Sequence, residues 1–115
     1  MNIQIFGKSK CFDTKKAERW FKERRIKFQL IDIAKFGMSN KEFDSIMRNV
    51  NSLDDIIDKK SKLYEKLFIK HLASESAVID SLFDNPALFK TPIVRNKQKA
   101  TIGYKPEVWE KWLDQ

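Results

Sequence analysis

The sequence predicts one α/β domain with the element order β-α-β, helical block, β-β-α and a mixed central sheet. Segments with alternating polar and apolar residues, typical of strands, lie near both ends of the chain. Between them, apolar residues recur at helical spacing over about residues 38–86. A chain of 115 residues is long enough to bury a core without disulfides or a structural metal.

The N-terminal segment predicts a strand followed by a helix. Residues 2–6, NIQIF, alternate polar and apolar side chains, and Gly7 ends this run as a strand would end. Residues 13–25 carry apolar side chains on one helical face and Lys and Glu on the other, which indicates an amphipathic helix. The apolar positions of this helix are Ala17, Trp20 and Phe21. Asp13 or Thr14 can cap its first turn.

A second strand is predicted at residues 27–33, KFQLIDI, where the alternation returns. The side chains expected to point inward are Phe28, Leu30 and Ile33. Because a helix separates the two strands, the start of the chain is typical of a β-α-β crossover.

The middle of the chain predicts short helices. Ser39 and Ser52 each precede a run with helical spacing, as residues at a helix start do. Two further helical runs follow, one over residues 76–83 and one with apolar positions at Leu63, Tyr64, Leu67 and Phe68.

The C-terminal segment predicts a hairpin and a helix. Residues 91–95 and 100–104 alternate like strands on either side of a turn through Asn96-Lys97. Pro106 suits the first turn of a helix. The apolar face of that helix is Val108, Trp109, Trp112 and Leu113.

The charge pattern argues against direct nucleic-acid binding. The net charge is +7, but segments such as KKAERWFKERR mix both signs at helical spacing. This mixture is typical of a solvated helix face rather than of a stripe that tracks phosphates.

The remaining composition suggests a cytoplasmic protein without membrane contact. No apolar run reaches membrane-spanning length, and the N-terminus lacks the pattern of a secretory signal. A single cysteine suits a reducing compartment. With one cysteine and one histidine, His71, no metal site is expected.

The only cysteine lies in GKSKCFDTKKA, residues 7–17, just ahead of the first predicted helix. Backbone N–H groups and the positive end of a helix dipole both favour a thiolate over a thiol. The nearby lysines Lys8, Lys10 and Lys15 add to this field. These features indicate an activated nucleophile at Cys11. The alternative is a cysteine that packs as a small apolar residue.

Several motifs at collinear spacing resemble the family of glutaredoxin-coupled arsenate reductases and the related Spx regulators. They are NIQIF, Cys11, Thr14-Lys15-Lys16-Ala17, Trp20, Ile26, Phe28, Ile56-Ile57, Ser61, Tyr64, Leu67, Asn85-Pro86, Thr91-Pro92-Ile93-Val94 and Gly103-Tyr104. The resemblance implies a thioredoxin-like fold, with residues 1–35 and 87–115 as its core and a helical insertion at about 38–86. It also implies a cis peptide bond before Pro92.

The resemblance further implies a thiol chemistry. Cys11 would attack a disulfide and form a mixed disulfide, which the co-substrate glutathione or a glutaredoxin would resolve. Thr14 would offer its hydroxyl to the thiolate, and Thr91-Pro92 would align the partner. Anion-binding candidates are Lys8, Lys10, Lys15, Lys60, Lys90 and Arg95. We expect a monomer with no bound cofactor.

The chain departs from the arsenate reductases at the arginines that hold the oxyanion. The corresponding positions are Asp58, Thr91 and Tyr104. None is an arginine, and a carboxylate repels an anion, which argues against arsenate reduction itself.

The alternative function is that of an Spx-like regulator that binds the C-terminal domain of the RNA polymerase α subunit without catalysis. The Spx family uses a Cys-x-x-Cys switch, but Thr14 stands at the second position here. No disulfide can therefore form within this chain. Residues 35–38, KFGM, correspond to the polymerase-binding surface of that family.

Overall fold

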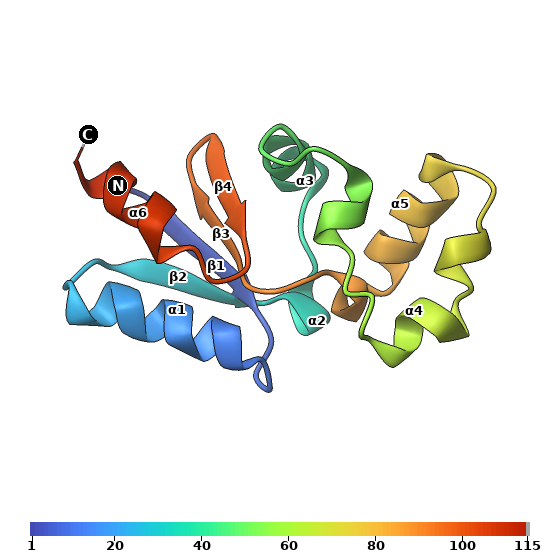
Figure 1. The fold of residues 1–115 in the computed structure, drawn as a ribbon, viewed down its shortest axis with the longest axis horizontal. Helices are drawn as coiled ribbons and strands as arrows, with labels where there is room; N and C mark the ends of the chain where they lie inside the picture. The colour runs from blue at the N-terminus through green and yellow to red at the C-terminus, as the bar shows by residue number, and fades with distance from the viewer. Residues whose placement is uncertain (115) are drawn as a thin grey trace.

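The computed structural model describes residues 1–114, which form a mixed α/β structure with a four-stranded sheet. The strands are β1 (Ile3–Gly7), β2 (Phe28–Asp32), β3 (Ile93–Asn96) and β4 (Lys99–Ile102). Their order in the sheet is β2-β1-β3-β4, with β1 and β2 parallel and the other two pairs antiparallel. The predicted mixed sheet is confirmed. In Figure 1 the sheet lies toward one end of the molecule, and the helices between β2 and β3 lie toward the other.

The first helix, α1 (Phe12–Glu23), connects β1 to β2 as the β-α-β pattern predicts. Its buried apolar residues are Ala17, Trp20 and Phe21, the three positions expected from the helical spacing. The inward orientation predicted for Leu30 is wrong, because this side chain is 49% exposed. β2 is an edge strand that pairs only with β1, and Leu30 belongs to neither apolar core cluster. Ile33 is buried, but it already begins a helix.

The chain between β2 and β3 contains only helices and loops among the described residues. These helices are α2 (Ile33–Phe36), α3 (Asn40–Met47), η1 (Leu53–Ile56), α4 (Lys62–Lys66), η2 (Ile69–His71), α5 (Glu75–Asp84) and η3 (Pro86–Leu88). Ser39 caps α3 by accepting a hydrogen bond from Glu42 N, as its position in the sequence predicts. Phe68 lies outside α4 with a φ of 53° and is 67% exposed, so its predicted place on a helix face is wrong.

The C-terminal hairpin and helix are present with shifted ends. The turn between β3 and β4 passes through Lys97 and Gln98, one residue later than predicted, and Lys97 has a φ of 58°. Helix α6 (Pro106–Leu113) buries Trp109 and Trp112. Leu113, the last residue of the helix and predicted on its apolar face, is 39% exposed.

Two apolar clusters hold the sheet from opposite sides. One joins the strands to α1 and α6 and comprises Ile3, Ile5, Ala17, Trp20, Phe21, Val94, Trp109 and Trp112. The other joins Phe6 and Ile93 to the helices between β2 and β3. Neighbouring residues of a strand point to opposite faces, so β1 and β3 contribute to both clusters. No described helix is long and apolar enough to span a bilayer.

One buried hydrogen bond tests the packing of α6. Trp109 Nε1 donates to Thr101 Oγ1 at 2.8 Å, and both side chains are buried. We expect Thr101→Val to lower the free energy of unfolding by about 1–3 kcal/mol, because it leaves the indole N–H without a buried acceptor. Urea denaturation measures this loss. Trp109→Phe removes the donor, so Thr101→Val should cost less in that background; an equal cost would contradict the prediction.

Candidate functional site

Cys11 lies in the turn between β1 and α1, as the N-cap residue of the 12-residue helix. Its backbone N–H donates to Lys8 O at 3.1 Å, and its carbonyl accepts the hydrogen bond from Lys15 N at 3.3 Å. The side chain is partly exposed. The thiol therefore lies beside the free N–H groups of the first helical turn, as the sequence predicts.

The side chain of Thr14 is buried and packs against this turn. It is 3% exposed, and its Oγ1 accepts a hydrogen bond from Lys8 N at 3.4 Å. A Cβ on Gly7 would lie 2.3 Å from Thr14 Cγ2, so no larger residue fits at position 7 without movement. The sequence pattern indicates Gly7 only as the end of a strand and does not predict this contact.

The Thr91-Pro92 segment faces Cys11 from the start of β3. The peptide bond between the two residues is cis, as the resemblance implied. The thiol of Cys11 donates to Thr91 O at 3.6 Å, and Thr91 is buried. Pro92 O accepts a hydrogen bond from Gly103 N at 2.8 Å, which fixes the segment against the end of β4.

The electrostatics of the site favour the thiolate. Partial burial raises the pKa of Cys11, but hydrogen bonds from the Thr14 and Thr91 side chains and from the N–H groups of Thr14 and Asp13 lower it further than burial raises it. The net result is a pKa below the ordinary value of a thiol. A larger fraction of Cys11 is thus ionised near neutral pH than for a free cysteine.

An open cleft of about 1120 Å³ lies in front of Cys11. Five of the other predicted site residues line it, namely Lys8, Lys10, Lys60, Lys90 and Thr91. Further charged residues along its walls are Asp13, Asp54, Asp55, Asp58, Lys59 and Lys105. The cleft is therefore mixed in charge rather than uniformly basic.

The structure places two predicted anion-binding residues outside this cleft. Arg95 is held by Gln4, to which its Nη1 donates at 2.7 Å, and by Ser45, to which its Nε donates at 3.4 Å. Lys15 is exposed on α1. Pro92 is buried next to Thr91 and does not line the cleft.

Asp58 contributes an ion pair that the sequence pattern does not predict. Its Oδ2 lies 3.4 Å from Lys8 Nζ, which belongs to the turn that carries Cys11. The two residues are 50 positions apart, and no local pattern links them. Only the packing of the helical segment against the sheet brings them together.

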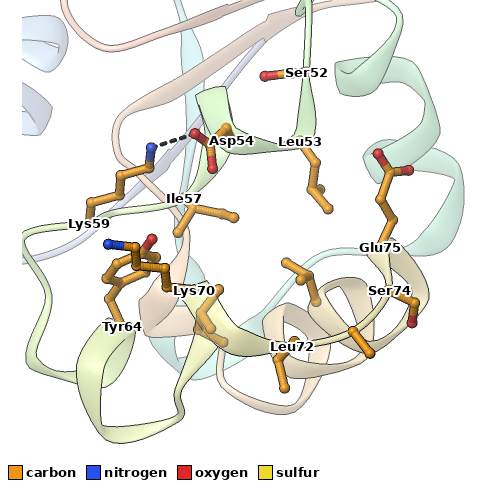
Figure 2. A pocket seen from close by; sticks show the side chains of 13 residues that line it. Ser52, Leu53, Asp54, Ile57, Lys59, Tyr64, Lys70, Leu72, Ser74 and Glu75 are labelled. Atoms are coloured by element: carbon orange, nitrogen blue, oxygen red, sulfur yellow. Dashed lines mark hydrogen bonds and ion pairs between the residues drawn. The ribbon is translucent and has the colours of Figure 1, made fainter.

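A second pocket, of about 560 Å³, lies within the helical segment and contains no cysteine (Figure 2). Apolar side chains such as Leu53 and Leu72 line it, and an ion pair between Asp54 and Lys59 lies at its edge (Figure 2). Asp54 and Lys59 also line the Cys11 cleft, so this pocket and the cleft are adjacent. Residues 1–114 contain no cluster of His, Cys, Asp or Glu that could hold a metal ion.

Comparison with known proteins agrees with this geometry. Residues 6–112 match the ArsC family. The chain belongs to the ArsC family. The Spx global transcriptional regulator of Streptococcus pyogenes serotype M6 is 31% identical over 104 residues, which covers 89% of this chain and 78% of that relative. The Spx 2 regulator of Oceanobacillus iheyensis is 29% identical over 107 residues, covering 90% and 78% respectively.

Solved structures of other ArsC proteins share the fold. An arsenate reductase from Vibrio cholerae superposes with a TM-score of 0.85 at 22% identity, covering 96% of this chain and 97% of that one. An ArsC-family related protein from Bacteroides fragilis gives a TM-score of 0.84 at 23% identity, with the same coverage of both chains. The predicted thioredoxin-like fold is confirmed.

The pKa of Cys11 gives a direct test of the site. The rate of alkylation by iodoacetamide should rise with pH around a midpoint below that of a free thiol, because only the thiolate reacts. Thr14→Val removes the hydroxyl that donates to the thiolate, so it should move this midpoint to higher pH. Thr14→Ser keeps the hydroxyl and should leave the midpoint near that of the unmodified protein. Equal midpoints for the Val variant and the unmodified protein would contradict the assignment.

Proposed function

We propose that this ArsC-family protein is a thiol-dependent oxidoreductase in which Cys11 forms a mixed disulfide with glutathione. One observation carries the proposal: a thiol with a lowered pKa lies at the N-terminus of α1 and faces an open cleft. A nucleophilic thiol needs both ionisation and access. A cysteine that only packed in the core would have neither.

The proposed reaction is thiol–disulfide exchange. The Cys11 thiolate attacks one sulfur of a disulfide, a new S–S bond forms, and the other sulfur leaves as a thiolate that takes a proton from water. The buried Thr91 and the neighbouring Pro92 present a backbone edge beside Cys11, which supports alignment of an extended peptide such as glutathione. A second thiol, from glutathione or a glutaredoxin, then releases Cys11.

The cleft supports a disulfide substrate better than a small oxyanion. Asp58 places a carboxylate on the wall of the cleft and pairs with Lys8. Oxyanions require several charge-assisted donors, and arginine supplies the best geometry for them. Arg95 is held by Gln4 and Ser45, away from the thiol. We therefore do not propose arsenate as the substrate.

Intact-mass spectrometry after incubation with oxidised glutathione tests the proposal. We expect the reduced protein to gain the mass of one glutathionyl group, because Cys11 is its single thiol. Added reduced glutathione or a glutaredoxin with its reductant should remove the adduct. Cys11→Ser should stay unmodified under the same conditions. A reduced, folded protein that gains no adduct would overturn the proposal.

A second candidate function is an Spx-like regulator that binds the C-terminal domain of the RNA polymerase α subunit. Its support is the identity of about 30% to Spx regulators and an exposed apolar surface beside β2. Leu30 and Phe36 are 49% and 70% exposed, and they border a shallow groove of about 370 Å³ with Gly37 and Met38. Exposed aromatic residues beside a groove are typical anchors of protein interfaces.

Binding of the isolated polymerase domain distinguishes this candidate. If the chain is a regulator, Phe36→Ser should weaken binding by about tenfold or more, because a central aromatic anchor is lost. Phe68→Ser is a matched control, since Phe68 is 67% exposed but lies in the helical segment, away from β2. Cys11→Ser should retain binding. Titration calorimetry measures all four proteins, and no binding by the unmodified chain would rule this candidate out.

A further inference from the structure

An ion pair between Lys8 and Asp58 lies in the cleft that Cys11 lines. Lys8 is tied to Cys11 through the backbone, because Lys8 O accepts the hydrogen bond from Cys11 N at 3.1 Å. Lys8 Nζ and Asp58 Oδ2 are 3.4 Å apart, and both residues line the cleft with Cys11. The pair is only partly exposed, with side-chain exposures of 21% for Lys8 and 31% for Asp58. Water and salt therefore screen it less than a fully exposed pair.

Hydrogen bonds hold both the carboxylate and the backbone of Asp58 in place. Its Oδ1 accepts a hydrogen bond from Lys60 N at 3.1 Å. Its backbone N–H donates to Leu88 O at 2.8 Å, within the short antiparallel bridge that joins Ile57 to Phe89. Phe89 is followed two residues later by Thr91. Asp58 is thus fixed relative to the same segment that faces the thiol.

Other charged groups around the cleft do not replace Lys8. Lys59 is paired with Asp54, and Asp13 lies 4.0 Å from Lys16. Lys10, Lys60 and Lys90 are exposed, so solvent screens their charges more strongly. Lys8 is the half-buried cation nearest in sequence to Cys11, and Asp58 offsets its charge.

We propose that Asp58 is a specificity-determining residue that makes Cys11 prefer disulfides with neutral or cationic groups beside the S–S bond over those with anionic groups. This inference rests on the proposed thiol–disulfide exchange. The Cys11 thiolate forms a bond to one sulfur, the S–S bond breaks, and the second sulfur carries the electron pair away as a thiolate. An anionic group beside that bond meets the Asp58 carboxylate, whereas the positive charge of Lys8 is already offset.

Glutathione satisfies this requirement. Its carboxylates lie at the two ends of the tripeptide, several bonds from the sulfur. Lys60 and Lys90 are exposed and line the same cleft, so they offer these carboxylates cationic partners away from the S–S bond. In a disulfide whose aromatic ring bears both the sulfur and a carboxylate, the ring holds the carboxylate close to the S–S bond.

Two small aromatic disulfides provide the test. One is 5,5′-dithiobis(2-nitrobenzoate), which is a dianion at pH 7, and the other is 4,4′-dithiodipyridine, which is neutral. The second-order rate constant of Cys11 with each is measured, and their ratio is compared between proteins. A change in the thiolate fraction alters both rates together, so the anion-to-neutral ratio isolates the effect of charge along the approach to the thiol.

Asp58→Asn should raise the anion-to-neutral ratio by about three- to tenfold at low salt, because it removes one negative charge and frees Lys8. The amide keeps an oxygen that can accept the hydrogen bond from Lys60 N. The increase should shrink toward unity in about 1 M salt, where charge interactions are screened. The rate with the neutral disulfide in the same variant reports whether the site is intact.

The matched control is Asp80→Asn, which makes the same change in net charge at an exposed position of α5 outside the cleft. It should leave the ratio within about twofold of the unmodified protein, as expected for a distant exposed charge. A ratio in Asp58→Asn equal to that of this control would overturn the role of Asp58, as would an increase that high salt does not reduce. If the unmodified protein fails to react even with the neutral disulfide, the proposed thiol chemistry itself fails.

Discussion

The antiparallel pairing of β1 with β3 is the constraint on which the candidate site depends. The chain leaves β1 at Gly7 and enters β3 at Ile93, and Phe6 pairs with Ile93 across the ladder. The turn that carries Cys11 and the segment that carries Thr91 therefore emerge at the same end of the sheet. One apolar cluster fixes this pair of strands from the side of α1 and α6, and the other fixes it from the side of the helical segment. The ladder between them thus brings the two halves of the site together.

The helical segment supplies charge to a thiol that the sheet has already positioned. The backbone of Ile57 forms an isolated bridge with Phe89, so this part of the segment is attached to the residues that lead into β3. This attachment carries Asp58 to within 3.4 Å of Lys8. The sheet and α1 thus provide the nucleophile and its hydrogen bonds, whereas the helical segment adjusts the charge that an approaching molecule meets. Substitutions in the loop near Asp58 can change the choice of substrate while the thiol and its helix stay as they are.

Much of the fold, and the position of Cys11 at the start of α1, could be predicted from local patterns. The alternation in residues 2–6 and the spacing of Ala17, Trp20 and Phe21 predict which side chains are buried. The position of Cys11 just before a helix predicts that backbone N–H groups lie near its thiol. The burial predicted for Leu30 is wrong because alternation shows only which residues of a strand lie on the same face. It does not show that β2 is an edge strand. The role of Gly7 depends on a contact with Thr14, and that of Asp58 on one with Lys8. Such contacts arise from tertiary packing, which a local pattern does not contain.

Thr14 stands where a Cys-x-x-Cys motif would carry its second cysteine, and its side chain is packed into the turn. Thr14 is 3% exposed, its hydroxyl accepts the Lys8 N–H, and its methyl group fills the space left by the missing side chain of Gly7. Position 14 is thus shaped for a hydroxyl and a methyl that support the turn. Any disulfide at Cys11 must be formed with a sulfur from outside, because the chain has no other cysteine. An open cleft in front of a lone thiol suits that requirement, since the incoming group needs room for both its sulfur and the chain that carries it.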